Sequence, residues 1–187
     1  MTRAILASLR RFCRSDSGTA SIEFVFVIPI ITMIFMASVE SSFYMARHVM
    51  LERALDVTMR ELRLGMMGAP SHNNLKIAIC ARGVILGSQT DCLASLKVWL
   101  QPLNGTTFAM PTLPASCVDR TAALNPALDP PPTEFVRGTG NQIMLVRVCL
   151  QEDPMFPTSP FGAQMVRDSV DGGYSVVSSS VFVNEPS

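Results

Sequence analysis

One long apolar run near the start of the chain dominates the pattern of hydrophobic and polar positions. Residues 22–39 read IEFVFVIPIITMIFMASV, and Glu23 is the only charged residue among them. A helix over these residues would be about 27 Å long, close to the thickness of the hydrocarbon core of a bilayer. We therefore predict a transmembrane helix over residues 19–39.

Two other interpretations of this run remain open. A secretory signal peptide has an apolar core of about 7–15 residues and then a cleavage site of small residues, whereas this run is longer and no clear site of that kind follows it. A buried core helix is the second alternative, and the basic residues before the run disfavour it.

Positive charge precedes the run. Residues 1–18 hold four arginines and one aspartate, although Lys+Arg and Asp+Glu are equal in number over the whole chain. The positive-inside rule places this basic leader in the cytoplasm and everything after about Val39 on the opposite side. A net charge of zero provides no basic field for a nucleic-acid partner. With 48% hydrophobic and 16% charged residues, an intrinsically disordered chain is also excluded.

The helix is expected to continue past the membrane as an amphipathic one. Residues 40–64 contain neither Gly nor Pro, and one set of residues recurs at steps of three and four, which places it on one helical face. This stripe consists of Tyr44, His48, Leu51, Leu55, Met59 and Leu62. Gly65 is a natural stop signal. We predict one helix from Thr19 to Leu64, whose second half packs against a head formed by residues 65–187.

Weaker patterns predict the elements of that head. Ser71 is suited to cap a short helix around Leu75–Ile79. Alternating or Val-rich segments predict strands at residues 96–101, 142–150 and 175–184. Seven prolines between residues 102 and 134 predict an extended surface loop. The predicted fold class is α+β, with a long N-terminal helix on a small antiparallel sheet of about three strands.

Four of the five cysteines lie on the exported side. Cys13 belongs to the leader, and the others are Cys80, Cys92, Cys117 and Cys149. An even number in an oxidising compartment predicts two disulfides. Of three possible pairings we favour Cys80–Cys92, which closes a short hairpin-like segment, with Cys117–Cys149, which attaches the proline-rich loop to a strand. Each would contribute roughly 3 kcal/mol.

The sequence contains no recognisable catalytic constellation. It has no G-x-S-x-G, no H-E-x-x-H and no phosphate-binding loop. No C-x-x-C occurs, and His48 and His72 are not at ligand spacing, so we expect no metal and no cofactor. Glu152 and Asp153, beside Pro154, are interpreted as a solvated turn. We therefore expect a protein that is not an enzyme.

The junction between the leader and the helix carries the candidate functional residues. Residues 18–24 read GTASIEF. An ionisable residue inside an apolar segment is costly and indicates function by default, although Glu23 could also lie near the interface and reach water. Pro29 lacks an N–H and clashes with the carbonyl of Val25, which predicts a kink. The kink at Pro29 is either a functional hinge or that of an ordinary, tolerated membrane proline, and neither interpretation is favoured.

This order of features resembles the processing site of type IV prepilins, which a membrane aspartyl peptidase cuts after the glycine. The resemblance implies cleavage after Gly18, so that Thr19 becomes the new N-terminus. It also implies that Glu23, with Phe24 beside it, contacts a neighbouring subunit and pairs with that subunit's free amine, which offsets the cost of two charges in an apolar filament core.

Both ends of the chain are similar to the TadE/TadF-like pseudopilins of the tight-adherence (Flp) pilus system, and to TadE more than TadF. The similar blocks are residues 10–64 and 138–186, the second with closing strands and the tail Asn184-Glu185-Pro186. Cys149-Leu150 departs from the family, which often has an aromatic residue there.

The resemblance implies a minor pseudopilin of the bacterial inner membrane with a periplasmic head. Its implied partners are the prepilin peptidase, a partner pseudopilin, the Flp pilin and the inner-membrane assembly platform. An unprocessed, anchored periplasmic scaffold or binding module would use the same anchor and would not need Gly18.

Overall fold

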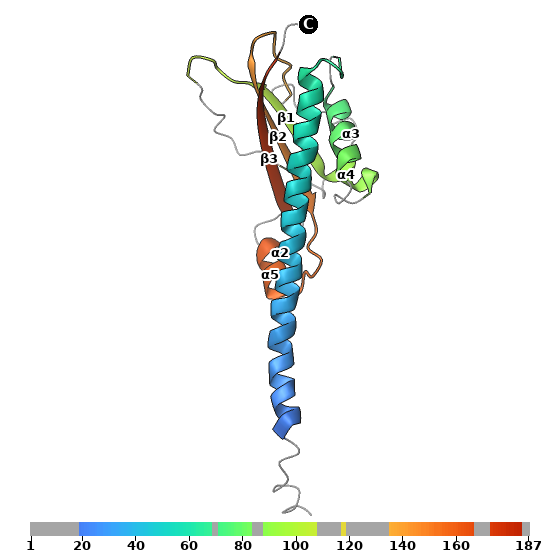
Figure 1. Cartoon of the computed structure of the whole chain (residues 1–187), viewed down its shortest axis with the longest axis vertical. Helices are drawn as coiled ribbons and strands as arrows, with labels where there is room; N and C mark the ends of the chain where they lie inside the picture. Colours follow the sequence, from blue (N-terminus) through green and yellow to red (C-terminus); the bar gives the residue numbers. More distant parts are fainter. Residues whose placement is uncertain are drawn as a thin grey trace, which may run out of the picture.

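One long helix carries a small sheet along its C-terminal half (Figure 1). This computed structural model describes residues 19–68, 71–83, 88–107, 117–118, 135–166 and 173–184. The leader, residues 1–18, lies outside the described residues, and so does most of the predicted proline-rich loop. Of that loop, Pro102 closes a strand and residues 103–107 are described after it.

Helix α2, Thr19–Arg63, has 45 residues and is therefore about 68 Å long. It ends in a Schellman motif, because the N–H of Gly65 donates to the carbonyl of Leu62 and that of Met66 to the carbonyl of Glu61, each at 3.1 Å. Gly65 has a φ of 69°, which a glycine adopts without the strain of a side chain. The predicted single helix and its stop signal are confirmed.

The sheet has three antiparallel strands in the order β1-β2-β3. They are β1, Leu96–Pro102, β2, Ile143–Glu152, and β3, Tyr174–Val183. Val148 of the central strand lies opposite Val98 on one side and Ser178 on the other. The predicted α+β class is thereby confirmed, with the three strands close to their predicted positions.

The hydrophobic core lies between one face of the sheet and the helices. The stripe on α2 supplies Leu51, Leu55 and Met59, each at most 2% exposed, with Tyr44 and Leu62 partly buried beside them. The strands supply alternating residues of the same face: Val98, Leu100, Met144, Val146, Val148, Leu150, Val176 and Phe182. The helical period of α2 and the two-residue period of the strands therefore meet in one core.

Three shorter helices complete the head. Helix α3, His72–Arg82, begins as predicted, because the Ser71 side chain accepts a hydrogen bond from the Asn74 N–H. Helices α4, Gln89–Ser95, and α5, Pro160–Val166, were not predicted. Helix α5 lies in the connection from β2 to β3 and packs beside α2, beyond the end of the sheet (Figure 1).

Candidate functional site: an exposed apolar helix and its junction with the head

The first half of α2 is apolar and uncovered. Its large side chains from Ile22 to Met36 are exposed, and Phe26 reaches 71%. The most apolar window of this helix has a mean hydropathy of 2.4 and none of it is buried. Monomeric soluble proteins rarely expose so large an apolar patch. By length and composition, α2 is able to cross a membrane, and the buried-core interpretation does not fit its exposure.

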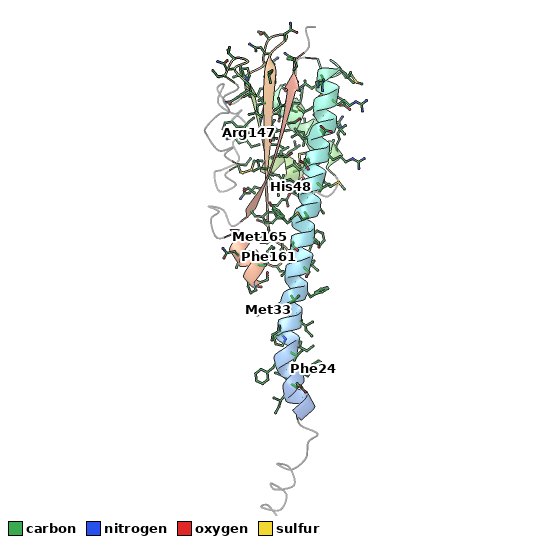
Figure 2. All side chains as sticks on the ribbon, turned by 60° about the vertical axis from the view of Figure 1, so that its left-hand side comes forward. Phe24, Met33, His48, Arg147, Phe161 and Met165 are labelled. Carbon is green, nitrogen blue, oxygen red and sulfur yellow. A yellow bond between two sulfur atoms is a disulfide. The ribbon has the colours of Figure 1, made fainter. Side chains whose placement is uncertain are left out.

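The predicted site residues at the start of α2 are only partly described. Gly18 lies outside the described residues, and Thr19 is the first residue of the helix. Glu23 and Phe24 lie on its first turns and are exposed. Figure 2 shows Phe24 far from the head. Their exposure leaves both side chains available to a neighbouring molecule, and their role stays a prediction.

Helix α2 continues through Pro29 without interruption. Thr32, one turn later, donates its hydroxyl to the carbonyls of Ile28 and Pro29, both at 2.9 Å. Ser38 donates in the same way to the carbonyl of Ile34 at 2.8 Å. The hydroxyls of Thr32 and Ser38 are thus paired within the helix, as an environment without water requires.

A buried carboxylate marks the point where the apolar half meets the head. Glu40 follows directly after the apolar run and is fully buried. Its two carboxylate oxygens accept hydrogen bonds from the backbone N–H groups of Met155, at 3.1 Å, and Phe156, at 2.9 Å. Hydrogen bonds to a charged acceptor are stronger than neutral ones. Glu40 therefore attaches the β2–β3 connection to α2.

A second attachment lies two turns further along α2. Arg47 forms an ion pair with Glu152 at 3.4 Å and donates to the carbonyl of Asp153 at 3.2 Å and to the hydroxyl of Tyr174. The expectation of a solvated turn is wrong for Glu152, which is the last residue of β2 and pairs with this arginine. Asp153 is exposed, but its carbonyl belongs to the same attachment.

The environment of Tyr174 is apolar enough to change its acidity. Its ring packs against Tyr44, with 5.6 Å between centroids, and the guanidinium of Arg47 lies 5.8 Å from its centroid. Burial raises the pKa of Tyr174 above its ordinary value, and the hydrogen bond from Arg47 opposes this shift without cancelling it. The Tyr174 oxygen accepts the hydrogen bond from Arg47.

The β2–β3 connection is itself tightly folded where it meets α2. The Ser159 hydroxyl donates to the Phe156 carbonyl at 2.8 Å and accepts from the Gly162 N–H at 3.0 Å. A Cβ atom at Gly162 would lie only 2.2 Å from the Phe156 carbonyl oxygen. Only glycine fits there, so the sequence of the connection is adapted to this compact form.

The sequence did contain a signal for Glu40. Extending the predicted stripe back by one step of four from Tyr44 reaches Glu40, on the same face of the helix as the core. A carboxylate on a core-facing stripe must find hydrogen-bond donors. The signal does not identify those donors, because they are backbone groups more than a hundred residues away.

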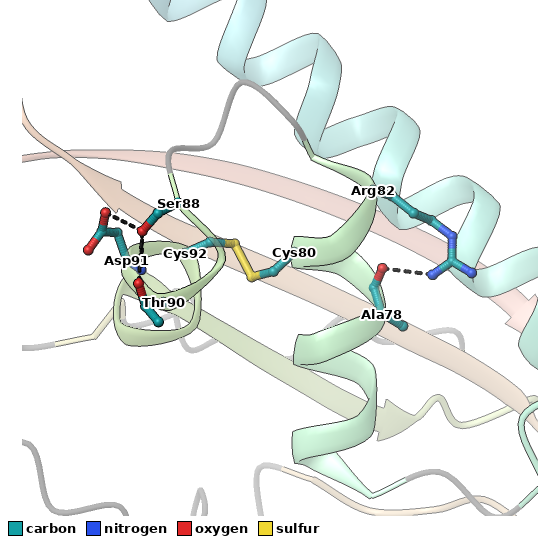
Figure 3. The surroundings of a disulfide bond; sticks show 7 residues. All are labelled: Ala78, Cys80, Arg82, Ser88, Thr90, Asp91 and Cys92. Carbon is teal, nitrogen blue, oxygen red and sulfur yellow. Dashed lines mark hydrogen bonds between the residues drawn. A yellow bond between two sulfur atoms is a disulfide. The ribbon is translucent and has the colours of Figure 1, made fainter.

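The cysteines lie in the pairs that the sequence favoured. Cys80 and Cys92 have Cα atoms 5.8 Å apart, and Cys117 and Cys149 5.3 Å, both as disulfides. The first joins α3 to α4 (Figure 3), so the two cysteines that it links both lie on short helices. Arg82, on the same helix as Cys80, forms an ion pair with Glu61 of α2. Within the described ranges, no three His, Cys, Asp or Glu side chains cluster as metal ligands would.

Comparison with known protein families gives a match that lies over α2. The model of the TadE-like protein family matches residues 18–60, which begin at Gly18 and include both the apolar half and most of the packed half of the helix. No curated protein and no solved structure matches the chain. The helical segment is TadE-like, as the sequence resemblance implied, and the match indicates a part in the Tad (Flp) pilus system.

Proposed function

We propose, from the TadE-like match, that this chain is a minor pseudopilin that takes part in the biogenesis of the Tad (Flp) pilus. In this proposal residues 19–39 cross the bacterial inner membrane, the basic leader lies in the cytoplasm and the head lies in the periplasm. The observation that carries the proposal is the uncovered apolar half of α2 within the matched residues.

The proposal includes removal of the leader by a prepilin peptidase after Gly18. Gly18 has no side chain, so its backbone can enter a narrow peptidase cleft in an extended form. The family match begins at Gly18, and the next residue, Thr19, belongs to α2. The start of the match at Gly18 supports a processing point at this junction.

Glu23 would then be the fifth residue of the mature chain, followed by Phe24. A carboxylate inside the hydrocarbon region is costly unless it is paired. The free amine of a neighbouring subunit provides that pairing, and the exposure of both side chains leaves them accessible to it. The proposed role is structural and non-catalytic, with no cofactor.

The proposed partners follow from the same pilus system. The peptidase would act first, and a partner pseudopilin and the Flp pilin would then contact the apolar half of α2. The inner-membrane assembly platform would receive the processed subunit. Each contact depends on a helix that is not covered by its own head, as the exposed side chains of residues 22–36 are here.

Co-expression of the full chain with a prepilin peptidase tests processing. The wild-type protein is expected to lose the mass of residues 1–18 and to begin at Thr19, whereas Gly18→Val is expected to keep its full mass. Gly105→Val is the matched control, since a side chain at Gly105 meets nothing within 4 Å. An unchanged wild-type mass would contradict processing and favour the anchored scaffold.

A second experiment separates the two candidate functions through Glu23. Glu23→Gln removes the charge that would pair with an amine, so we expect normal processing but loss of pilus assembly in cells. Glu52→Gln, an exposed change on the same helix, is the control and should assemble normally. Normal assembly with Glu23→Gln would support the unprocessed scaffold or binding module instead.

A further inference from the structure

A short uncharged segment lies beside α2 at the end of its apolar half. Residues 154–166, read as PMFPTSPFGAQMV, contain no Asp, Glu, Lys, Arg or His. Charged residues bound this segment in the sequence, with Asp153 before it and Arg167 and Asp168 after it. The segment includes α5 and is half apolar by composition, although it is a surface connection between two strands.

Glu40 fixes the position of residues 154–166 along the axis of α2. The backbone N–H groups of Met155 and Phe156 donate to this carboxylate, which is the residue directly after Val39, where the apolar run ends. Figure 2 shows Phe161 and Met165 beside α2, between the levels of Met33 and His48. The uncharged segment therefore lies at the end of the predicted membrane span.

Several large apolar side chains are exposed at this level. Met155 is 49% exposed and Phe161 39%, and on α2 Met36 and Phe43 are exposed to a similar degree. In water this exposure would be unfavourable. At the boundary between lipid headgroups and acyl chains, apolar and aromatic side chains of an amphipathic segment are stabilised by insertion.

We infer that residues 154–166 insert shallowly into the surface of the bilayer that α2 crosses, with Met155 and Phe161 at the level of the upper acyl chains. This inference rests on the membrane span of the proposed function. The segment packs beside α2 at the end of that span, and the absence of charge over residues 154–166 suits a lipid surface. The head is then attached to the membrane at two points.

Fluorescence quenching by brominated lipid tests this inference. Trp99 is the only tryptophan, so a Trp99→Phe background leaves no other tryptophan emission. Reporters are placed singly in the full-length chain as Phe161→Trp, Met155→Trp, Phe35→Trp and Val181→Trp. Each protein is reconstituted in phosphatidylcholine vesicles brominated either near the headgroup end or near the methyl end of one acyl chain.

The two segment reporters are expected to be quenched at least about twofold more by the shallow bromines than the Val181→Trp control is. Val181 is exposed and lies seven residues along β3 from Tyr174, about 23 Å from the junction, so its tryptophan should show only background quenching. Phe35→Trp reports the span and should be quenched by both lipids, because it lies within the hydrocarbon region.

The outcomes distinguish the two proposals. Quenching of Phe35→Trp without quenching of either segment reporter overturns the surface insertion and leaves the membrane span intact. No quenching of Phe35→Trp overturns the span, and the insertion falls with it. Equal quenching of the segment reporters and Val181→Trp overturns the insertion, because lipid would then contact the head without preference for residues 154–166.

Discussion

Glu40 and Phe156, 116 residues apart in the sequence, meet through a hydrogen bond of 2.9 Å between a buried carboxylate and a backbone N–H. The second oxygen of the same carboxylate accepts the N–H of Met155. One side chain thus pairs two backbone donors of the β2–β3 connection, which Arg47 also attaches to α2 through the carbonyl of Asp153. The head is attached to α2 by this contact as well as by its core.

Replacing Glu40 with glutamine should weaken the attachment. The amide keeps one acceptor oxygen, but its NH₂ group then faces a backbone N–H and leaves that buried donor unpaired. We expect the free energy of unfolding to fall by about 1–3 kcal/mol. Urea unfolding of the detergent-solubilised full chain, followed by Trp99 fluorescence, measures the change.

The matched control for this prediction is Glu52→Gln, on the exposed face of the same helix. It should change the free energy of unfolding by less than about 0.5 kcal/mol. Amide hydrogen exchange adds a local readout, because only Glu40→Gln should speed exchange at Met155 and Phe156. Equal stability of the two variants would mean that the hydrogen bonds to Glu40 contribute nothing net.

Gly162→Ala should destabilise the β2–β3 connection. The added methyl would meet the Phe156 carbonyl oxygen at 2.2 Å, so the backbone must move, at a cost of about 1–3 kcal/mol. Gly105→Ala provides the comparison, because nothing lies within 4 Å of its added methyl. Limited proteolysis should cut the Gly162→Ala chain faster near residues 154–166, and equal cutting of both variants would contradict the close contact.

Removing the disulfide between α3 and α4 should reduce stability without removing the fold. Cys80 and Cys92 are separated by 12 residues in sequence, and a loop of this size corresponds to about 3 kcal/mol of chain entropy. The Cys80→Ala/Cys92→Ala double variant should therefore unfold at lower urea concentration than the oxidised wild type. An unchanged midpoint would show that the unfolded chain is not constrained by this bond.

The stability of the protein should depend on Tyr174 at alkaline pH. Its pKa is raised above 10.0, chiefly by burial. An acid whose pKa is higher in the folded than in the unfolded state contributes stability that is complete below the unfolded value and is lost as the pH rises through the folded one. Above about pH 10, the wild type should therefore lose stability faster than Tyr174→Phe.

Urea unfolding of both proteins at several pH values on either side of the ordinary tyrosine pKa provides the measurement. The difference between the wild type and Tyr174→Phe should be constant at lower pH and should shrink or reverse as the pH rises. Parallel curves over the whole alkaline range would contradict the raised pKa. The comparison cancels contributions from groups that both proteins share, including Lys76, whose pKa is lowered by burial.

The long helix and the sheet were predictable because their patterns are local. The stripe through Leu51, Leu55 and Met59 repeats with the helical period, and Gly65 ends the helix through its own backbone conformation. The second strand was predicted to end at residue 150 but continues to Glu152. Its polar last residues resemble a loop in sequence, and their pairing with β3, Glu152 opposite Tyr174, is a long-range contact.

Long-range contacts also explain why three features were not predictable: helices α4 and α5 and the attachment at Glu40. A helix of seven residues has little intrinsic stability and forms through tertiary contacts such as the one at Gly162. The partners of Glu40 are backbone groups whose position depends on the whole sheet. The predicted residues at the start of α2, Glu23 and Phe24, are exposed, so packing within the described part of the chain does not define their role.

The paired attachments at Glu40 and Arg47 restrict rotation of α2 relative to the head at the point where the apolar half of the helix leaves it. Two attachments on one side of a helix, about 10 Å apart along its axis, resist both rotation about that axis and bending. Any rotation of α2 about its own axis would thus rotate the sheet by the same angle. A torque applied to the apolar half of α2 would therefore be transmitted to the sheet.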